Sequence, residues 1–172
     1  MKSAIATTRN ELSRALSGSI QQLAEPAFFT IGEAGYSVMG RFKERPIIID
    51  LYPYDEMFIR LDCKTIYDFQ IVPNSFFARL NFLKDTRIFT RDENFDIAFV
   101  VRSRYYSQFA SWLMHIEIRD SILSLTSFMY LMFKRNLLRF RTKIDFDHQE
   151  ANEILNSVKI LDTLAASLES LP

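Results

Sequence analysis

One cluster of side chains near the C-terminus has the residue types that bind a divalent cation. Asp145, Asp147, His148 and Glu150 are close in sequence, and carboxylates and imidazole are common metal ligands. On a helix, however, His148 and Glu150 would point to different sides, because residues at i and i+2 do not face each other. Acidic residues also stabilise the start of a helix without any ligand. We therefore interpret this cluster as a helix start, and the sequence predicts no metal site and no cofactor site.

Two more residues have side chains suited to acid–base or hydrolytic catalysis. Asp96 could act as a general base if it were buried and paired, and His115 could do so if another group oriented it. The plainer interpretation is that Asp96 stabilises a turn or pairs with Arg91 or Arg102, and that His115 interacts with carbonyl groups at a helix end. An enzyme would use Asp96, His115 or His148, since side chains that are distant in sequence can meet in space. The sequence leaves this question open and favours a non-enzymatic protein.

The short motifs of common nucleotide and metal sites do not occur in this sequence. There is no GxxxxGK[ST], GxGxxG or HExxH pattern and no EF-hand loop. Cys63 is the only cysteine, which excludes an internal disulfide and a thiolate metal cluster.

Basic and aromatic residues of a predicted hairpin are the best candidates for a contact surface. Side chains alternate along a strand, so Arg139, Arg141 and Lys143 share one face. The full candidate surface is Arg102, Arg104, Arg139, Arg141, Lys143, Phe128 and Tyr130. Such a surface is also found in sheet domains that bind RNA or single-stranded DNA, which therefore stays an alternative. We do not expect nucleic acid, because 21 Lys and Arg residues balance 21 Asp and Glu residues, and basic residues on edge strands also prevent aggregation.

The order of the predicted elements is typical of an α+β fold. Apolar residues at helical spacing predict long amphipathic helices over residues 1–25 and 146–170. Between them, strands are predicted near residues 36–43, 47–52, 57–62, 66–72, 95–101, 128–133 and 137–143, and helices near 76–83, from 105 onward and near 117–125. Asn136 tolerates the left-handed turn that the last hairpin needs. We expect one α+β domain over residues 1–172, with a mostly antiparallel sheet of five to seven strands in residues 35–143, packed by helices.

Some of these residues also resemble a group of bacterial domains. Phe95, Asp96, Phe99, Val100 and Ser103 match its Phe-Asp pair, strand and loop, and Leu113, Ile118 and Ile122 match the helices that follow. Gly40, Arg41 and Phe42, with Arg45 and Pro46, are similar to its early hairpin. The chain thus resembles a loose group of uncharacterised bacterial α+β domains over roughly residues 35–143. The resemblance implies a fold and no site.

Composition and hydropathy limit the kinds of protein this chain can be. Hydrophobic residues make up 48% of the sequence, which is enough for a sizeable core. No segment has the roughly 20 apolar residues that cross a bilayer, and the charged N-terminus does not resemble a signal peptide. We therefore expect no transmembrane segment and a cytoplasmic location. A net charge of zero protects weakly against association, so we expect a protein partner or a homodimer.

The sequence thus favours a non-enzymatic protein-interaction module, such as an assembly, adaptor or regulatory subunit. It would act through its helices and an aromatic and basic sheet face. The alternatives are a metal-assisted or hydrolytic enzyme, or an RNA- or single-stranded-DNA-binding sheet domain. A small-molecule ligand stays unknown.

Overall fold

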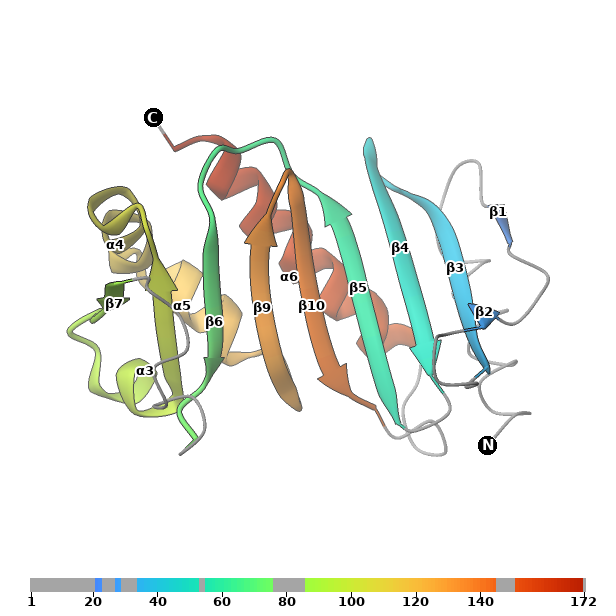
Figure 1. The fold of residues 1–172 in the computed structure, drawn as a ribbon, viewed down its shortest axis with the longest axis horizontal. Coiled ribbons are helices and arrows are strands. Elements are labelled where there is room, and N and C mark those ends of the chain that lie inside the picture. Colours follow the sequence, from blue (N-terminus) through green and yellow to red (C-terminus); the bar gives the residue numbers. More distant parts are fainter. Residues whose placement is uncertain are drawn as a thin grey trace.

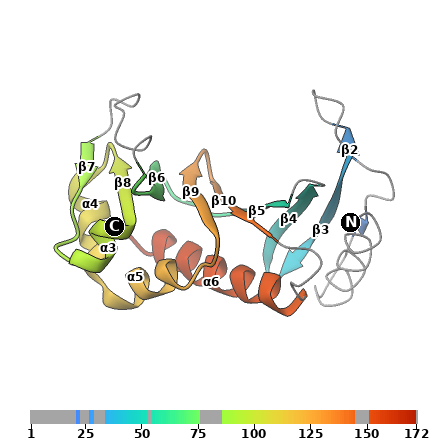
Figure 2. The ribbon, with the colours of Figure 1, turned by 90° about the horizontal axis from the view of Figure 1, so that it is seen from below.

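The computed structural model describes residues 21–22, 27–28, 34–52, 55–75, 86–144 and 151–171. These residues form an α+β fold in which a broad antiparallel sheet is packed by helices on one side (Figures 1 and 2). The predicted helix at 76–83 and the start of the C-terminal helix at 146–150 lie outside the described residues. Most of the predicted N-terminal helix also lies outside the described residues.

Within the described part of the chain, the sheet contains ten strands. Two of them, β1 (Gln21–Gln22) and β2 (Ala27–Phe28), have only two residues each. The others are β3 (Ala34–Phe42), β4 (Arg45–Tyr52), β5 (Glu56–Asp62), β6 (Phe69–Pro73), β7 (Thr86–Ile88), β8 (Phe99–Ser103), β9 (Phe128–Lys134) and β10 (Leu137–Lys143). Their order is β1-β3-β4-β5-β10-β9-β6-β8-β7, with β2 also paired to β3.

The predicted number of five to seven strands was therefore too low. Even without β1 and β2, eight strands remain among the described residues. β7 was missed because three residues in a charged stretch give no measurable periodicity. Gln21 and Gln22 were assigned to a helix, but they pair with Met39 and Val38 of β3, whose backbone offers hydrogen-bonding groups at that edge.

The described helices are α3 (Glu93–Ala98), α4 (Tyr106–Met114), α5 (Ile116–Leu123) and α6 (Ala151–Glu169). The long C-terminal helix is confirmed by α6. The strand predicted from Phe95 was wrong at its start, because Phe95 belongs to α3. The Asp92 side chain accepts a hydrogen bond from the Phe95 N–H at 3.1 Å and caps this helix, so the apolar run is divided and β8 begins only at Phe99.

One face of the sheet and the inner sides of the helices form the hydrophobic core. α6 crosses behind the central strands (Figure 1) and buries a continuous stripe, in which Ile154, Val158, Leu161, Leu164 and Leu168 are at most 1% exposed. The Trp112 indole N–H donates to the Ser167 hydroxyl at 2.9 Å and joins α4 to α6. The apolar stripe of α6 therefore packs on the sheet.

The other face of the sheet, which we call the open face, is covered by none of the described helices (Figure 2). Alternation along each strand decides which side chains reach it. In β4, Ile47, Ile49 and Leu51 lie in the core, whereas Ile48 and Tyr52 are only half-buried on the open face. The β9–β10 hairpin is confirmed, and positive φ angles at Arg135 (55°) and Asn136 (61°) give the tight turn that keeps these two strands in register.

Candidate functional site

The predicted catalytic candidates do not form an active site in the described part of the chain. The Asp96 carboxylate accepts hydrogen bonds from the backbone N–H and the hydroxyl of Thr90, both at 3.0 Å for Oδ1. It thereby holds the loop before α3. His115 is exposed at the α4–α5 junction, where its backbone N–H donates to the Trp112 carbonyl at 3.3 Å. His148 lies outside the described residues, and no three His, Cys, Asp or Glu side chains among those described could hold a metal ion.

The neighbouring carboxylate of Asp92 is also explained by local structure. The Phe95 N–H bonds to it and, with the Arg119 guanidinium at 3.0 Å, holds the pKa of Asp92 below its ordinary value. Arg119 also donates to the carbonyl groups of Leu113 and Met114 at the end of α4. This arrangement fixes α3 and α4 to α5.

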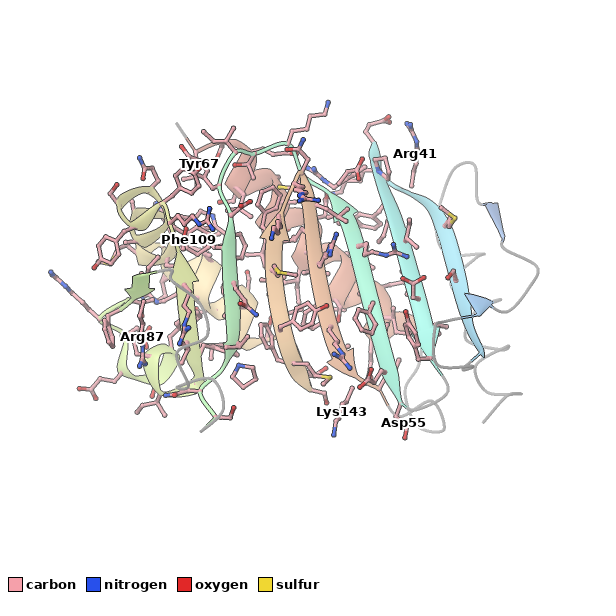
Figure 3. The ribbon with its side chains drawn as sticks, viewed as in Figure 1. Arg41, Asp55, Tyr67, Arg87, Phe109 and Lys143 are labelled. Carbon is pink, nitrogen blue, oxygen red and sulfur yellow. The ribbon has the colours of Figure 1, made fainter. Side chains whose placement is uncertain are left out.

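The open face brings together arginines from four strands that are far apart in sequence. Arg60 of β5 lies directly opposite Arg139 of β10, and Arg87 of β7 lies directly opposite Arg102 of β8. Met132 of β9 and Gln70 of β6 complete the line between these two pairs. We call Arg60, Arg139, Arg102 and Arg87 the arginine row. Figure 3 looks onto this face, with Arg87 labelled near one end of the sheet and Arg41 near the other.

Carboxylates neutralise only part of this positive charge. The Asp50 carboxylate accepts a hydrogen bond from Arg60 at 2.6 Å and one from the Ser37 hydroxyl at 2.5 Å. Glu56 pairs with Arg141 at 2.6 Å. Among the described residues, the Arg139 side chain has no ion pair and no hydrogen bond. An uncompensated half-buried guanidinium therefore lies in the middle of the open face.

Four arginine side chains of the open face are partly buried. The Nε atoms of Arg60, Arg87, Arg139 and Arg141 are shielded from solvent and have no hydrogen-bond partner among the described residues. A buried donor without a partner costs about 1–3 kcal/mol. Like charges directly opposite each other on adjacent strands also destabilise a sheet, so both features of these arginines cost stability.

Aromatic side chains lie beside the row and contact each other. The ring centroids of Tyr52 and Phe58 are 5.1 Å apart, those of Phe58 and Tyr130 are 6.4 Å apart, and the Arg141 guanidinium carbon is 4.9 Å from the Phe58 ring. Burial raises the pKa of both Tyr52 and Tyr130, so their hydroxyl groups stay protonated at neutral pH.

Phe128 was wrongly assigned to the contact surface. It is half-buried and packs against the core, with its ring centroid 4.7 Å from that of Phe99 and 5.5 Å from that of Phe140. The reason is a register shift between Arg141 and Thr142, where the β9–β10 pairing is irregular. The shift places Phe128 opposite Thr142, which is buried, and strict alternation cannot detect it.

The other predicted contact residues lie on or beside the open face. Arg102, Arg139, Arg141 and Tyr130 project from their strands onto it. Lys143 is exposed at the end of β10, opposite Glu56. Arg104 is exposed just after β8 and lines a cavity of about 210 Å³ together with Asp68, Gln70, Met132 and Lys134.

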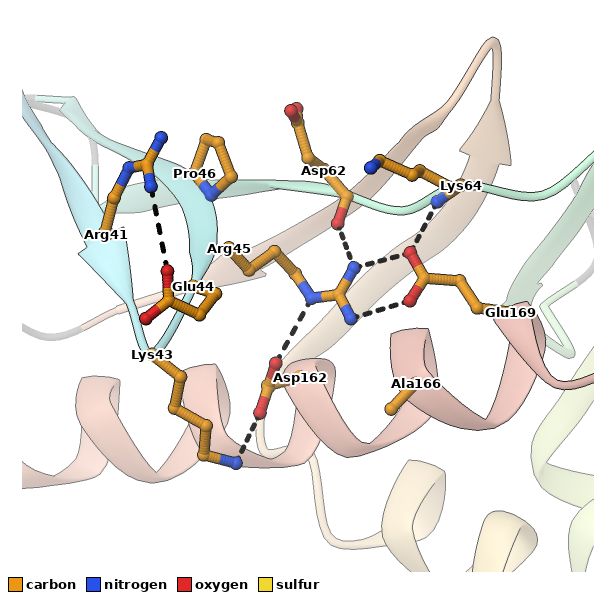
Figure 4. Close-up of a pocket in the computed structure, with 10 residues that line it drawn as sticks. All are labelled: Arg41, Lys43, Glu44, Arg45, Pro46, Asp62, Lys64, Asp162, Ala166 and Glu169. Atoms are coloured by element: carbon orange, nitrogen blue, oxygen red, sulfur yellow. Dashed lines mark hydrogen bonds and ion pairs between the residues drawn. The ribbon is translucent and has the colours of Figure 1, made fainter.

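A second polar cluster surrounds Arg45 in a surface cavity of about 590 Å³ between the β3–β4 turn and α6 (Figure 4). The Arg45 guanidinium donates to both Glu169 carboxylate oxygens, at 2.7 and 2.9 Å, and to Asp162 at 3.2 Å. Lys43 binds Asp162 at 2.6 Å, and the hydrogen bond from Arg45 holds the pKa of Glu169 below its ordinary value. These charges satisfy each other, so the cluster braces β4 against α6.

Sequence reasoning missed Arg60 and Arg87 as members of the open face. Alternation along β5 already indicates that Arg60 points to the other face of the sheet from the buried residues of this strand. The sequence therefore contained enough information to place Arg60 on the open face. The pairing of β5 with β10 was not predictable from either strand alone, because the two strands are far apart in sequence. Arg87 lies outside every strand and helix predicted from the sequence, so no pattern pointed to it.

Comparisons with known proteins inform the fold. No family model matches the chain, and no curated protein matches its sequence. Within the described residues, no helix has the length and apolar character to span a membrane. The fold is similar to that in the crystal structure of the mycobacterial trehalose monomycolate transport factor A, TtfA. The TM-score is 0.67 at 8% identity, and the match covers 98% of this chain and 97% of that one. The chain therefore shares an α+β fold with this transport factor over nearly its whole length.

Proposed function

We propose that this chain is a non-enzymatic protein-interaction module whose partner binds the open face. The observation that carries the proposal is the half-buried Arg139, which has no described acidic partner on a sheet face that no described helix covers. Unmatched charge next to half-buried aromatic and apolar side chains is typical of a binding site and disfavours a purely structural role.

The packing of α6 supports the open face of the sheet, rather than this helix, as the proposed binding surface. Its apolar stripe is already buried, so docking through that stripe would require the core to open. An isologous homodimer through the open face would place one arginine row near another, which is unfavourable. A partner with the opposite charge is the better complement.

An adaptor or assembly role is compatible with the likeness to a transport factor. An adaptor or assembly protein works by contacting its partners, so it needs no cluster of catalytic side chains. We extend the proposal to the cytoplasm, where the buried thiol of Cys63 would stay reduced. Fractionation of cells that contain the chain tests this location.

Site-specific photo-crosslinking in the native cell tests the proposed surface. A photoreactive amino acid replaces Met132 at the centre of the open face, and a control replaces Thr163, which is exposed on α6. We expect a discrete crosslinked product from position 132 that disappears when Arg139→Glu is added. Crosslinking from position 163 alone, or crosslinking at 132 that is insensitive to Arg139→Glu, would overturn the proposal.

A further inference from the structure

We infer that Arg139 binds a single carboxylate of a protein partner, supplied by an acidic side chain that apolar residues flank. This inference rests on the proposed function and adds the chemistry that the partner brings to the open face. It follows from the charge balance around Arg139, from the nitrogens that its side chain has available, and from its apolar surroundings.

The charged groups around Arg139 lack one carboxylate. Arg60 lies directly opposite Arg139 on β5, and Arg141 follows it by two residues on β10, so the three guanidinium groups share the open face. Asp50 pairs with Arg60 at 2.6 Å, and Glu56 pairs with Arg141 at 2.6 Å. Among the described residues, three guanidinium groups therefore face two carboxylates, and the charge without a counterion is that of Arg139.

The next acidic residue on this face does not supply the missing charge. Asp62 lies opposite Leu137, one cross-strand position away from Arg60 and Arg139 on the same face. Lys134 lies on the other side of Leu137. Asp62 and Lys134 are both exposed, and their opposite charges offset each other. The charge on Arg139 is therefore left for a group from outside the chain.

The Arg139 side chain can offer the paired donors that a carboxylate accepts. Of its three nitrogens, only Nε is shielded from solvent without a partner, so the two terminal Nη nitrogens are open to an incoming group. A carboxylate accepts two parallel N–H bonds from one guanidinium. One aspartate or glutamate side chain is thus sufficient to satisfy the outer end of Arg139.

Half-buried apolar side chains around Arg139 favour apolar residues next to the partner's carboxylate. Met132 lies directly opposite Arg139 on β9, and Leu137 precedes it by two residues on β10. Ile48 lies beyond Arg60 on β4. Apolar residues that cover these side chains exclude water, and a charge-assisted hydrogen bond is stronger where water is excluded. Strong interface contacts are typically an arginine or aromatic residue enclosed in this way.

The same surface is poorly suited to nucleic acid. Nucleic acid binds through several phosphates at once, whereas Asp50 and Glu56 already occupy two of the three guanidinium groups and would repel further phosphates. Base stacking needs a free ring face, and the Arg141 guanidinium carbon already lies 4.9 Å from the Phe58 ring. A single carboxylate fits this charge balance better.

An NMR titration of the full chain with blocked tripeptides tests the inference. The probe is a glutamate between two leucines, and the matched probe has glutamine in place of glutamate. We expect the glutamate probe to shift the Nε–H resonance of Arg139, to bind more weakly as salt is raised, and to bind at least tenfold more tightly than the glutamine probe. Arg139→Gln should raise the Kd of the glutamate probe about tenfold, the loss of one charge-assisted contact. Arg139→Lys keeps the charge without the paired donors and should raise it less.

The matched control is Arg135→Gln, which changes an exposed arginine in the β9–β10 turn and should leave the Kd unchanged. Thermal unfolding confirms that each variant is folded. Equal binding of the two tripeptides would overturn the inference, and so would tighter, Arg139-dependent binding of inorganic phosphate or oligouridine. If the glutamate probe does not bind while the crosslink from position 132 still depends on Arg139, the carboxylate is refuted and the proposed function stands. Absence of that crosslink overturns the proposed function itself.

Discussion

The Arg45 cluster allows a sharp test of how the β3–β4 hairpin is fixed to α6. The Arg45→Met variant keeps a long apolar side chain but removes the bonds to Glu169 and Asp162 and the 2.6 Å bond to the Asp62 carbonyl. The side chains of Arg45 and Asp162 are only 16% and 9% exposed, so the carboxylates left behind are poorly solvated. Loss of one partner costs 3–5 kcal/mol when the pair is fully buried and below 1 kcal/mol when it is exposed. For this intermediate case we expect a loss of about 2–4 kcal/mol.

Urea unfolding followed by the fluorescence of Trp112, the only tryptophan, measures this loss. The matched control is Arg41→Met, because Arg41 is a neighbouring arginine whose pair with Glu44 is long, at 3.9 Å, and largely exposed. We expect the control to unfold close to the original urea midpoint. The double variant Arg45→Met, Glu169→Gln should recover part of the loss, since it removes an unpaired charge. If Arg45→Met and Arg41→Met unfold at the same urea concentration, the cluster does not brace α6.

Three further predictions follow from buried or paired groups. Arg45 lowers the pKa of Glu169 below its ordinary 4.5 in the folded chain. As the pH falls, Glu169 therefore takes up a proton in the unfolded chain before it does so in the folded chain. The stabilisation is therefore fully present well above pH 4.5 and is lost in the pH range below it, as the pH falls through the lowered pKa of Glu169 in the folded chain. Urea midpoints should fall less steeply over this range in Glu169→Gln than in the unaltered chain. Burial raises the pKa of Cys63 to about 12, so iodoacetamide should label it slowly in the native chain and rapidly in urea, as followed by mass spectrometry. Equal labelling rates would refute its burial. Trp112→Ala should destabilise the chain by about 3–5 kcal/mol, whereas Ser167→Ala, which removes only the hydrogen bond, should cost about 1 kcal/mol. Circular dichroism monitors both variants, and equal losses would contradict the packing role of the indole.

Local pattern was sufficient for the elements with strong periodicity. The stripe from Ile154 to Leu168 predicted a long helix, and α6 confirms it. The alternation in 137–143, with Asn136 before it, predicted the β9–β10 hairpin and the side of β10 on which Arg139 lies. Each of these features depends on residues within a few positions of one another, so the sequence contains the information directly.

Features that depend on competition between local and distant contacts were not predicted. The apolar run at Phe95 fits a strand, but the Asp92 cap turns its first part into α3. The register shift after Arg141 turns Phe128 toward the core side of the sheet, although alternation placed it beside Tyr130. In the first case a helix cap overrides the local pattern, and in the second an irregular strand pairing does so.

The sequence by itself determined which side chains share a face in the predicted strands that pair regularly, and that no common catalytic motif is present. Only the tertiary structure decided that β5 and β10 are neighbours, as are β8 and β7, and thus that four arginines form one row. The physical reason is that periodicity within a strand shows which of its side chains point to each face, but it does not show which strands lie beside it. The neighbours of a strand are chosen by the burial of the whole core, to which every element contributes.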